Sequence, residues 1–362
     1  MDSSYCKIFK WQKTFPLSLG GKLSEMQVAY ESWGILNEDK SNAILLFTGL
    51  SASAHAKSHG KNDQPGWWEA MIGPGQALDT DRFFVMCFNH LGGCFGSSGP
   101  SSINPKTGKP YGPDFPPLVL QDMVDAVRLV VDSFGIQKVY CSMGASMGGM
   151  LAMEFAARHA SLVERMIMIS ASGRPEPMSI AYRFVQRQVV LNDPHFAGGW
   201  YYDKPNKPTA SMAVAREIGN ITYRSRQEFN ERFGRSRTGR GYNLGPDFQV
   251  ESYLHHMGNK LAANFDPNSF ILLTKAMDLY SLGYEFSTYE KGVNRISARC
   301  LIVGVTTDML FAWEEQENVY KSLKKLGKDV AFKLLDSTSG HDAFLVEVDY
   351  FRKVISTFLR DE

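Results

Sequence analysis

Short apolar runs alternate with amphipathic helical patterns through the first 172 residues of the chain. The apolar runs end in glycine-bearing loops, which is typical of buried strands. Between residues 120 and 134 apolar side chains recur every three or four positions, which predicts an amphipathic helix that Gly135 ends. Strand, helix and strand in series indicate parallel pairing, with helices on the faces of the sheet. The predicted strands are 42–48, 82–88, 138–143 and 163–170, and the predicted helices are 120–134 and 149–159.

The pattern changes after Ser172. From residue 173 to 295 the chain is rich in aromatic residues, Met, Arg and Asn, with helical patterns and no clear strand. The alternation of strand and helix then resumes. We therefore expect an α/β core formed by 1–172 and 296–362, with a helical lid insertion at 173–295 over the carboxyl edge of the sheet. The insertion has predicted helices at 180–191, 211–223, 248–265 and 269–279; the later core has predicted strands at 300–305 and 330–335 and helices at 313–326 and 348–359.

The composition favours small-molecule chemistry. Of the 362 residues 44% are apolar and 21% are charged, the profile of an ordinary globular protein. The 39 basic and 38 acidic side chains leave a net charge of +1, so the charge gives no reason to expect a nucleic-acid or membrane partner. The length suits one large domain or a core that carries an inserted piece.

The cysteines and the N-terminal segment bear on the compartment. The five cysteines include no CxxC pair, so we expect neither a disulfide framework nor a zinc knuckle, which favours a reducing compartment. Residues 1–7 lack the apolar stretch of a secretory signal, and no stretch of about 18 apolar residues could span a bilayer. We expect a soluble cytoplasmic protein, with an organelle address left open.

The pentapeptide Gly144-Ala145-Ser146-Met147-Gly148 matches the pattern GxSxG and lies between a predicted strand and a predicted helix. Small residues around the serine allow the sharp, strained turn that lifts a nucleophilic hydroxyl clear of the sheet. The helix behind it directs N–H groups to the same place, so we expect the Met147 N–H to bind an oxyanion. A glycine-rich turn with an incidental serine is the alternative, and the flanking strand and helix favour the nucleophile.

A serine hydroxyl needs a base, and GxSxG enzymes of the α/β-hydrolase fold carry serine, acid and histidine in that chain order. His341 is the only histidine after the helical segment, and it follows the last predicted strand. Asp308 follows the strand at 300–305, where it would hold the imidazole tautomer. Asp336 is the competing acid. We therefore predict that Ser146, Asp308 and His341 form a catalytic triad.

The other seven histidines show no spacing typical of metal ligands, so we expect no metal site. His255 and His256 are adjacent, so on a helix their side chains diverge by about 100° and would not chelate one ion together. We expect all seven on the lid surface or along the cleft. They are His55, His59, His90, His159, His195, His255 and His256.

Four segments resemble the homoserine O-acetyltransferase family, in a match that runs from about residue 29 to residue 359. The resemblance implies the α/β-hydrolase fold, with a mostly parallel sheet flanked by helices and an inserted helical lid. It also implies an acyl group that passes from acyl-CoA to the serine and then to the hydroxyl of an amino acid. Members are usually homodimers; acetyl-CoA or succinyl-CoA is a co-substrate, and no bound cofactor is expected. The segments are 144–150 (GASMGGM), 265–270 (FDPNSF), 276–279 (AMDL) and 340–345 (GHDAFL).

The same resemblance implies three substrate-binding residues. An Arg followed seven residues later by a Tyr is met by Arg216 and Tyr223, and the Asp after the catalytic histidine is met by Asp342. A zwitterionic amino acid needs a cation for its carboxylate and an anion for its ammonium group, which a guanidinium and a carboxylate supply. Without the resemblance, Arg216 would be interpreted as a solvated helix charge and Asp342 as a helix cap.

The chain departs from the family in two places. The segment 47–52 (FTGLSA) stands where relatives read His-Ala-Leu-Thr-Gly, although Leu50 keeps the leucine whose N–H completes the oxyanion hole. With 65–69 (PGWWE), this variant resembles the fungal branch that acylates L-serine. In the lid, 255–257 (HHM) stands where relatives have Tyr-Gln. Both departures favour a serine-type acceptor over homoserine.

The expected reaction is ping-pong acyl transfer in sulfur amino acid biosynthesis, with His341 activating first Ser146 and then the acceptor hydroxyl. An esterase or thioesterase would use the same triad with water as acceptor. A non-catalytic α/β-hydrolase-fold binding protein is a third hypothesis, which the intact triad disfavours. The choice between serine and homoserine stays open, because one methylene is worth only about 1–3 kcal/mol in a pocket. The acyl group, acetyl or succinyl, stays open as well.

Overall fold

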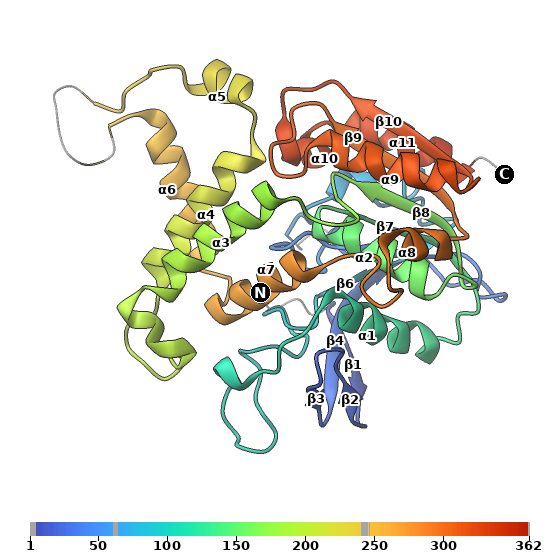
Figure 1. The fold of residues 1–362 in the computed structure, drawn as a ribbon, viewed down its shortest axis with the longest axis horizontal. Helices are drawn as coiled ribbons and strands as arrows, with labels where there is room; N and C mark the ends of the chain where they lie inside the picture. Colours follow the sequence, from blue (N-terminus) through green and yellow to red (C-terminus); the bar gives the residue numbers. More distant parts are fainter. Residues whose placement is uncertain (1–4, 61–63, 240–244, 246, 361–362) are drawn as a thin grey trace.

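A computed structural model describes residues 5–60, 64–239, 245 and 247–360 (Figure 1). Its centre is an eight-stranded sheet with the order β1-β4-β6-β5-β7-β8-β9-β10. The six strands from β5 to β10 pair in parallel, whereas β4 pairs antiparallel with β1 and β6. A small second sheet pairs β2 with β3. The strands are β1 Lys7–Trp11, β2 Phe15–Pro16, β3 Lys22–Leu23, β4 Met26–Trp33, β5 Ala43–Phe47, β6 Phe84–Phe88, β7 Val139–Ala145, β8 Val163–Ile169, β9 Arg299–Val305 and β10 Val330–Leu335.

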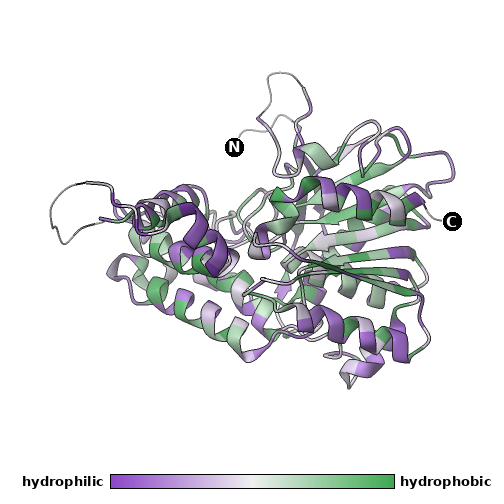
Figure 2. Cartoon of the chain, turned by 90° about the horizontal axis from the view of Figure 1, so that it is seen from above, coloured by the Kyte–Doolittle hydropathy of each residue, from purple (hydrophilic) through white to green (hydrophobic). Residues whose placement is uncertain are grey.

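The central strands are buried on both faces, which explains their continuous apolar sequences. In β5, Leu45 and Phe47 pack in the core on one face of the sheet, whereas Ile44 and Leu46 pack in the core on the other. The strands are accordingly the most hydrophobic part of the α/β body in Figure 2. The first core includes side chains of α1 (Leu120–Ser133), α2 (Met147–Arg158), α8 (Tyr289–Arg295) and α9 (Trp313–Lys325), and the second includes side chains of α11 (Val348–Arg360).

Between β8 and β9 the described residues contain six α-helices and no strand, and α3 to α6 project from one side of the sheet (Figure 1). Among these projecting helices, α4 packs against both α3 and α6. The last of the six helices, α8, packs instead on α2 and α9 of the core. The projecting helices and their companions are α3 Pro177–Leu191, α4 Thr209–Tyr223, α5 Arg226–Phe233, α6 Gln249–Ala262 and α7 Pro267–Leu279; the short helices are α10 Ala343–Val346, η1 Glu69–Met71, η2 Gly112–Asp114, η3 Pro194–Gly199 and η4 Gly340–Asp342.

The structure contains elements that the sequence-based expectation lacked, among them β1 to β4, α5 and α8, and it shifts the bounds of others. Strands β1 and β4 were not predicted, because polar and apolar residues do not alternate regularly in them and β4 is largely buried on both faces. The helix expected at 248–265 ends earlier, at Ala262, and the helix expected at 269–279 begins earlier, at Pro267. The Asp266 side chain caps this second helix by accepting from the Ser269 N–H.

None of the helices in the described parts of the chain combines the length and apolar character needed to cross a membrane. Residues 1–4 of the N-terminal segment considered for a secretory signal lie outside the described residues.

Candidate active site

Ser146 lies on the turn between β7 and α2 in a backbone conformation that L-residues rarely adopt. Its φ is +58° and its ψ is −128°, and the residue is buried. Such backbone costs about 1–3 kcal/mol and persists only where the surrounding structure holds it in place. This is the strained strand-to-helix turn that the GxSxG pattern predicts.

The two glycines of the pattern are required by close packing. A Cβ on Gly148 would lie 2.1 Å from the carbonyl oxygen of Phe47. A Cβ on Gly144 would lie 2.4 Å from the carbonyl carbon of Gly148. Any larger residue at either position would therefore push β5, β7 and α2 apart at the point where Ser146 is presented.

The two expected oxyanion donors come from segments that adjoin Ser146. Met147 is the first residue of α2, so its N–H has no acceptor within the helix. Leu50 lies just after β5, and its neighbour Gly49 is so near the nucleophile that an added Cβ would lie 4.0 Å from the Ser146 Cβ. The assignment of Leu50 and Met147 as the oxyanion hole stays a prediction, and this arrangement is compatible with it.

Asp308 and His341 form a buried pair at the carboxyl ends of β9 and β10. The imidazole Nδ1 lies 2.8 Å from Asp308 Oδ2. The other carboxylate oxygen, Oδ1, accepts from the N–H groups of Leu310 and Phe311, both at 2.9 Å. Both oxygens are therefore held, and an Nδ1–H that donates to the carboxylate leaves Nε2 as the basic nitrogen of the ring.

The competing acid, Asp336, does not take this place. It is exposed and accepts from the Thr306 hydroxyl at 3.0 Å. A neighbouring pair of contacts joins the two loops instead: Thr307 Oγ1 donates to the Ser337 carbonyl at 2.6 Å and accepts from the Gly340 N–H at 3.2 Å. These contacts hold the loop that carries His341 against the loop that carries Asp308.

The pKa of His341 reflects opposing effects. Burial disfavours the imidazolium and by itself lowers the pKa. The negative charge of Asp308, its hydrogen bond to the ring and the nearby charge of Asp342 outweigh burial, so the pKa is raised above 6.5. A more basic imidazole is better able to take a proton from a serine hydroxyl.

Arg216 and Tyr223 lie on α4 and link two parts of the site. Arg216 Nη1 donates to the Ser51 hydroxyl at 3.4 Å, next to Leu50. The Arg216 guanidinium also stacks over the Tyr223 ring, 4.8 Å from its centroid. The Tyr223 ring in turn lies 5.8 Å from the His341 ring, centroid to centroid. The structure therefore brings the predicted Arg–Tyr pair next to both the Leu50 loop and the His341 imidazole.

Asp342 is joined to an arginine that the sequence analysis did not single out. Its Oδ2 lies 3.3 Å from Arg224 Nη2, and Arg224 also contacts Glu228. Asp342 is half-buried, and no contact between it and Arg216 is recorded among the described residues. A substrate ammonium group at Asp342 would have to share this carboxylate with Arg224.

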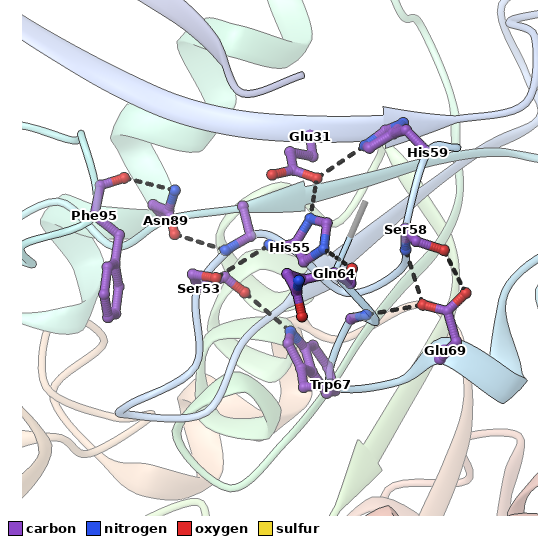
Figure 3. A network of polar contacts seen from close by, with 12 residues as sticks. Glu31, Ser53, His55, Ser58, His59, Gln64, Trp67, Glu69, Asn89 and Phe95 are labelled. Atoms are coloured by element: carbon purple, nitrogen blue, oxygen red, sulfur yellow. Dashed lines mark hydrogen bonds and ion pairs between the residues drawn. The ribbon is translucent and has the colours of Figure 1, made fainter. Parts of the chain in front are cut away.

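A polar network that sequence reasoning missed holds the loop after β5 (Figure 3). The Glu31 carboxylate, on β4, is buried, and its Oε2 contacts His55 Nδ1 at 3.0 Å and His59 Nε2 at 2.8 Å. The His59 ring stacks on Trp33. A correct assignment of β4 from the sequence would have placed Glu31 inside the core, where a carboxylate needs partners.

Glu69 holds the other end of this loop (Figure 3). Its carboxylate accepts from the Ser58 N–H and hydroxyl, from Lys57 Nζ and from the Gly66 N–H. Burial alone would raise the pKa of Glu69, but these hydrogen bonds outweigh it and lower the pKa to about 2. The loop that begins at Leu50 is therefore tied to β4 through Glu31 and to the start of η1 through Glu69.

The expectation that seven histidines lie on the lid surface or along the cleft is wrong for His90, which is buried directly after β6. His55 and His59 are partly buried and contact the buried Glu31 carboxylate. Only His255 of the adjacent lid pair has a recorded charged partner among the described residues, Glu217 at 3.0 Å. In the described part of the chain, no group of three or more His, Cys, Asp or Glu side chains is arranged to hold a metal ion.

The chain is similar to proteins of known kind over nearly its whole length. Residues 42–348 match the model of a family described as the alpha/beta hydrolase fold. A serine O-succinyltransferase from Xanthomonas campestris pv. campestris is 44% identical over 96% of this chain and 95% of the relative. A homoserine O-acetyltransferase from Methanosalsum zhilinae is 40% identical over 98% of this chain and 73% of the relative.

A solved structure of a different activity is also close. Esterase E22 is 28% identical, with a TM-score of 0.91 over 98% of this chain and 99% of that chain. The fold is therefore shared by proteins named for transfer and for hydrolysis. The higher identities belong to the transferases, which confirms the family resemblance seen in the sequence. The chain belongs to the α/β-hydrolase fold and, within it, to the family of O-acyltransferases that includes homoserine O-acetyltransferases and serine O-succinyltransferases.

Proposed function

We propose that this protein transfers an acyl group from acyl-CoA, through Ser146, to the side-chain hydroxyl of L-serine or L-homoserine. The observation that carries the proposal is the buried Asp308–His341 pair, at the same sheet edge as a serine in a strained strand-to-helix turn. The two kinds of acyltransferase relative supply the two acceptors. The departures at 47–52 and 255–257 favour serine.

In the first half-reaction His341 Nε2 takes the Ser146 proton as Oγ attacks the thioester carbonyl. The C–S bond breaks, the thiolate of CoA takes the proton from His341, and an acyl ester remains on Ser146. Asp308 stabilises the imidazolium that forms in between without taking its proton. The Leu50 and Met147 N–H groups stabilise the negative oxygen of the tetrahedral intermediate.

In the second half-reaction His341 takes the proton of the acceptor hydroxyl, which attacks the acyl ester. The Ser146 oxygen leaves and recovers its proton from His341. Arg216 binds the acceptor carboxylate, and its contact with Ser51 places that charge beside the Leu50 loop. Asp342 binds the acceptor ammonium group in competition with Arg224, which lies 3.3 Å away.

Helices α3 to α7 serve as a lid in this proposal, since α4 supplies Arg216 and Tyr223. The chain acts as a homodimer through the lid. Exposed apolar side chains on α3 and α4 support a dimer interface on these two helices, because large exposed apolar patches on soluble proteins mark interaction sites. They are Met178, Phe184, Val185, Leu191, Val214 and Ile221.

The proposed setting is the biosynthesis of sulfur-containing amino acids in the cytoplasm. The proposed donor is acetyl-CoA or succinyl-CoA, used as a co-substrate with no resident cofactor. The transferase names of the relatives and the small-molecule character of their acceptors support this setting.

A mass-spectrometric acceptor screen tests the proposal. Purified protein is mixed with L-serine or L-homoserine and with acetyl-CoA or succinyl-CoA in all four combinations, and each is compared with a reaction that lacks the amino acid. We expect O-acylated amino acid in at least one combination, with CoA released in equal amount. Free acid with no acylated amino acid in any combination would instead establish the hydrolase that esterase E22 exemplifies.

A further inference from the structure

The loop that carries Leu50 is held from behind by a buried histidine that the reaction itself does not use. His90 lies two residues after the end of β6 and is 8% exposed. Its Nε2 lies 3.1 Å from the carbonyl oxygen of Gly49 and 3.0 Å from the hydroxyl oxygen of Thr48.

The two contacts decide where the proton of this imidazole sits. A carbonyl oxygen can only accept a hydrogen bond, so the Nε2 that faces Gly49 must carry hydrogen. The Thr48 hydroxyl oxygen is then a second acceptor for the same N–H. Burial lowers the pKa of His90 to about 4, so near neutral pH the ring is uncharged and holds its single proton on Nε2.

The carbonyl of Gly49 and the N–H of Leu50 belong to one peptide group. A trans peptide is planar, and its C=O and N–H point in opposite directions. A hydrogen bond that holds the carbonyl toward His90 therefore aims the Leu50 N–H away from His90. Among the described residues the carbonyl also accepts from the Ala52 N–H, over a longer N···O distance of 3.4 Å.

This peptide lies beside the nucleophile. A Cβ on Gly49 would come within 4.0 Å of Ser146 Cβ and of the Ala145 carbonyl oxygen. A Cβ on Gly148, at the start of α2, would lie 2.1 Å from the Phe47 carbonyl oxygen and 2.8 Å from the Thr48 carbonyl oxygen. A rotation of the Gly49–Leu50 peptide would thus change the donors that Ser146 faces without moving Ser146.

The residue before His90 holds the same loop at a second point. Asn89 Oδ1 accepts from the Ala54 N–H at 2.6 Å, and its Nδ2 donates to the Phe95 carbonyl at 2.7 Å (Figure 3). Two consecutive side chains at the end of β6 therefore grip the segment from Thr48 to Ala54. This leaves the Gly49–Leu50 peptide little freedom to turn.

We propose that His90 is a positioning residue for the oxyanion hole: by donating to the Gly49 carbonyl, it holds the Leu50 N–H toward the acyl carbonyl attacked by Ser146. The inference rests on the proposed function only in assigning Ser146 as the nucleophile and the Leu50 N–H as an oxyanion donor. Polarisation of the peptide by the His90 hydrogen bond also strengthens the Leu50 N–H as a donor.

The test compares His90→Met with His90→Gln. Methionine and glutamine have similar length and volume, but only the glutamine side chain can donate to the Gly49 carbonyl. Met123→Leu is the control, because Met123 lines the same small apolar cavity as His90 and does not contact the Leu50 loop in any recorded interaction of the described residues. Active sites are counted with a fluorophosphonate that labels Ser146, so that rates refer to folded protein.

Two readouts separate positioning from folding. The first is the rate of acylation by p-nitrophenyl acetate. The second is the affinity for a trifluoromethyl ketone, in which Ser146 Oγ bonds to the carbonyl carbon, the serine proton passes to His341 and the ketone oxygen becomes an oxyanion. Loss of a direct oxyanion donor costs about 10²–10³ in rate. For His90→Met, which acts through the donor, we expect a loss of about 10- to 100-fold in both readouts, with acceptor KM unchanged.

His90→Gln should recover most of the loss, and Met123→Leu should match the parent protein. Equal acylation rates and ketone affinities in His90→Met and His90→Gln would overturn the proposal. If His90→Met does not fold, Thr48→Val is tested in its place. It leaves the hydrogen bond from His90 to the Gly49 carbonyl intact and should keep at least about a third of the parent's acylation rate. A collapse of the ketone affinity in Thr48→Val would show that the Gly49 hydrogen bond is not what matters. If the protein cleaves the ester but acylates neither amino acid, the proposed function is rejected. The comparison of the His90 variants then still tests the role of His90, because the ester reaction needs no amino acid.

Discussion

The turn that presents Ser146 and the loop that presents Leu50 lie side by side, yet they are held by different kinds of force. The turn is determined locally, by a strand, a helix and two glycines whose replacement would bring atoms within 2.4 Å. Among its described residues the loop has no helix or strand before η1. It is held by Glu31 and His90, which are 24 and 41 residues from their partners in the loop, and by Glu69 at its own end. The comparison shows that the placement of Ser146 depends on backbone sterics, whereas the placement of Leu50 depends on polar contacts across the fold.

The largest expected effect tests the turn. Ser146→Ala should lower kcat by about 10⁴- to 10⁶-fold, because the members of a triad act as a unit. The turn should keep its shape, since the glycines and not the serine make the close contacts, so the thermal midpoint should stay close to that of the parent. Steady-state assays and calorimetry check both statements. Near-normal turnover would exclude Ser146 as the nucleophile.

The next largest expected effect tests the pair formed by Asp308 and His341. Asp308→Asn should lower kcat by about 10⁴-fold, because an amide no longer holds the imidazole tautomer. Asp336→Asn, the matched control on the neighbouring loop, should change kcat less than about threefold, since Asp336 is exposed and accepts a hydrogen bond from Thr306 rather than from His341. Equal losses in the two variants would mean that the wrong acid has been assigned.

The pH profile sharpens the same prediction. In the parent protein kcat/KM should fall as the pH drops through the raised pKa of His341, that is, with a midpoint above 6.5, since only the neutral imidazole is a base. Asp308→Asn removes the Asp308 charge and its hydrogen bond, which raise this pKa, and leaves burial, which lowers it, opposed only by the nearby charge of Asp342. The midpoint of the residual activity should therefore move down. A midpoint that stays in place would assign the acid limb to another group.

A smaller effect tests the bridge that α4 makes between the loop and His341. Arg216→Gln should raise the acceptor KM by about 10- to 100-fold, because a hydrogen bond to a charged group contributes about 1.5–3 kcal/mol. The rate of acylation by p-nitrophenyl acetate, which needs no amino acid, should change little. A slowed ester reaction would instead show that Arg216 supports the Leu50 loop through Ser51.

The smallest expected effect on rate tests the loop. Asn89→Ala leaves the Ala54 N–H and the Phe95 carbonyl without their partner, which should lower the free energy of unfolding by about 1–3 kcal/mol. The acylation rate should fall only a few-fold, since His90 still holds the Gly49 carbonyl. Asn192→Ala, at an exposed position, should cost less than about 0.5 kcal/mol in the same denaturant titration. An undiminished stability in Asn89→Ala would mean that the loop is held elsewhere.

The sequence by itself determined much of this protein, because the relevant information is local. The parallel strands follow from residue periodicity and the GxSxG turn from the glycines next to the serine. The acid and the histidine were then predicted from the chain order that this fold uses. The choice between Asp308 and Asp336 as partner of His341 could only be weighed, because both follow a strand and only their contacts tell them apart.

The tertiary structure decided the rest. Three sets of contacts join residues that are distant in sequence: Glu31 with its two histidines, Arg224 with Asp342, and His90 with the Gly49 carbonyl. Glu31 also lies on a strand that the pattern did not reveal. A hydrogen bond depends on a separation of about 3 Å and on direction, which only the packed chain sets. Hydrophobic periodicity reports which face of an element is buried, and it is silent on which polar groups then meet there.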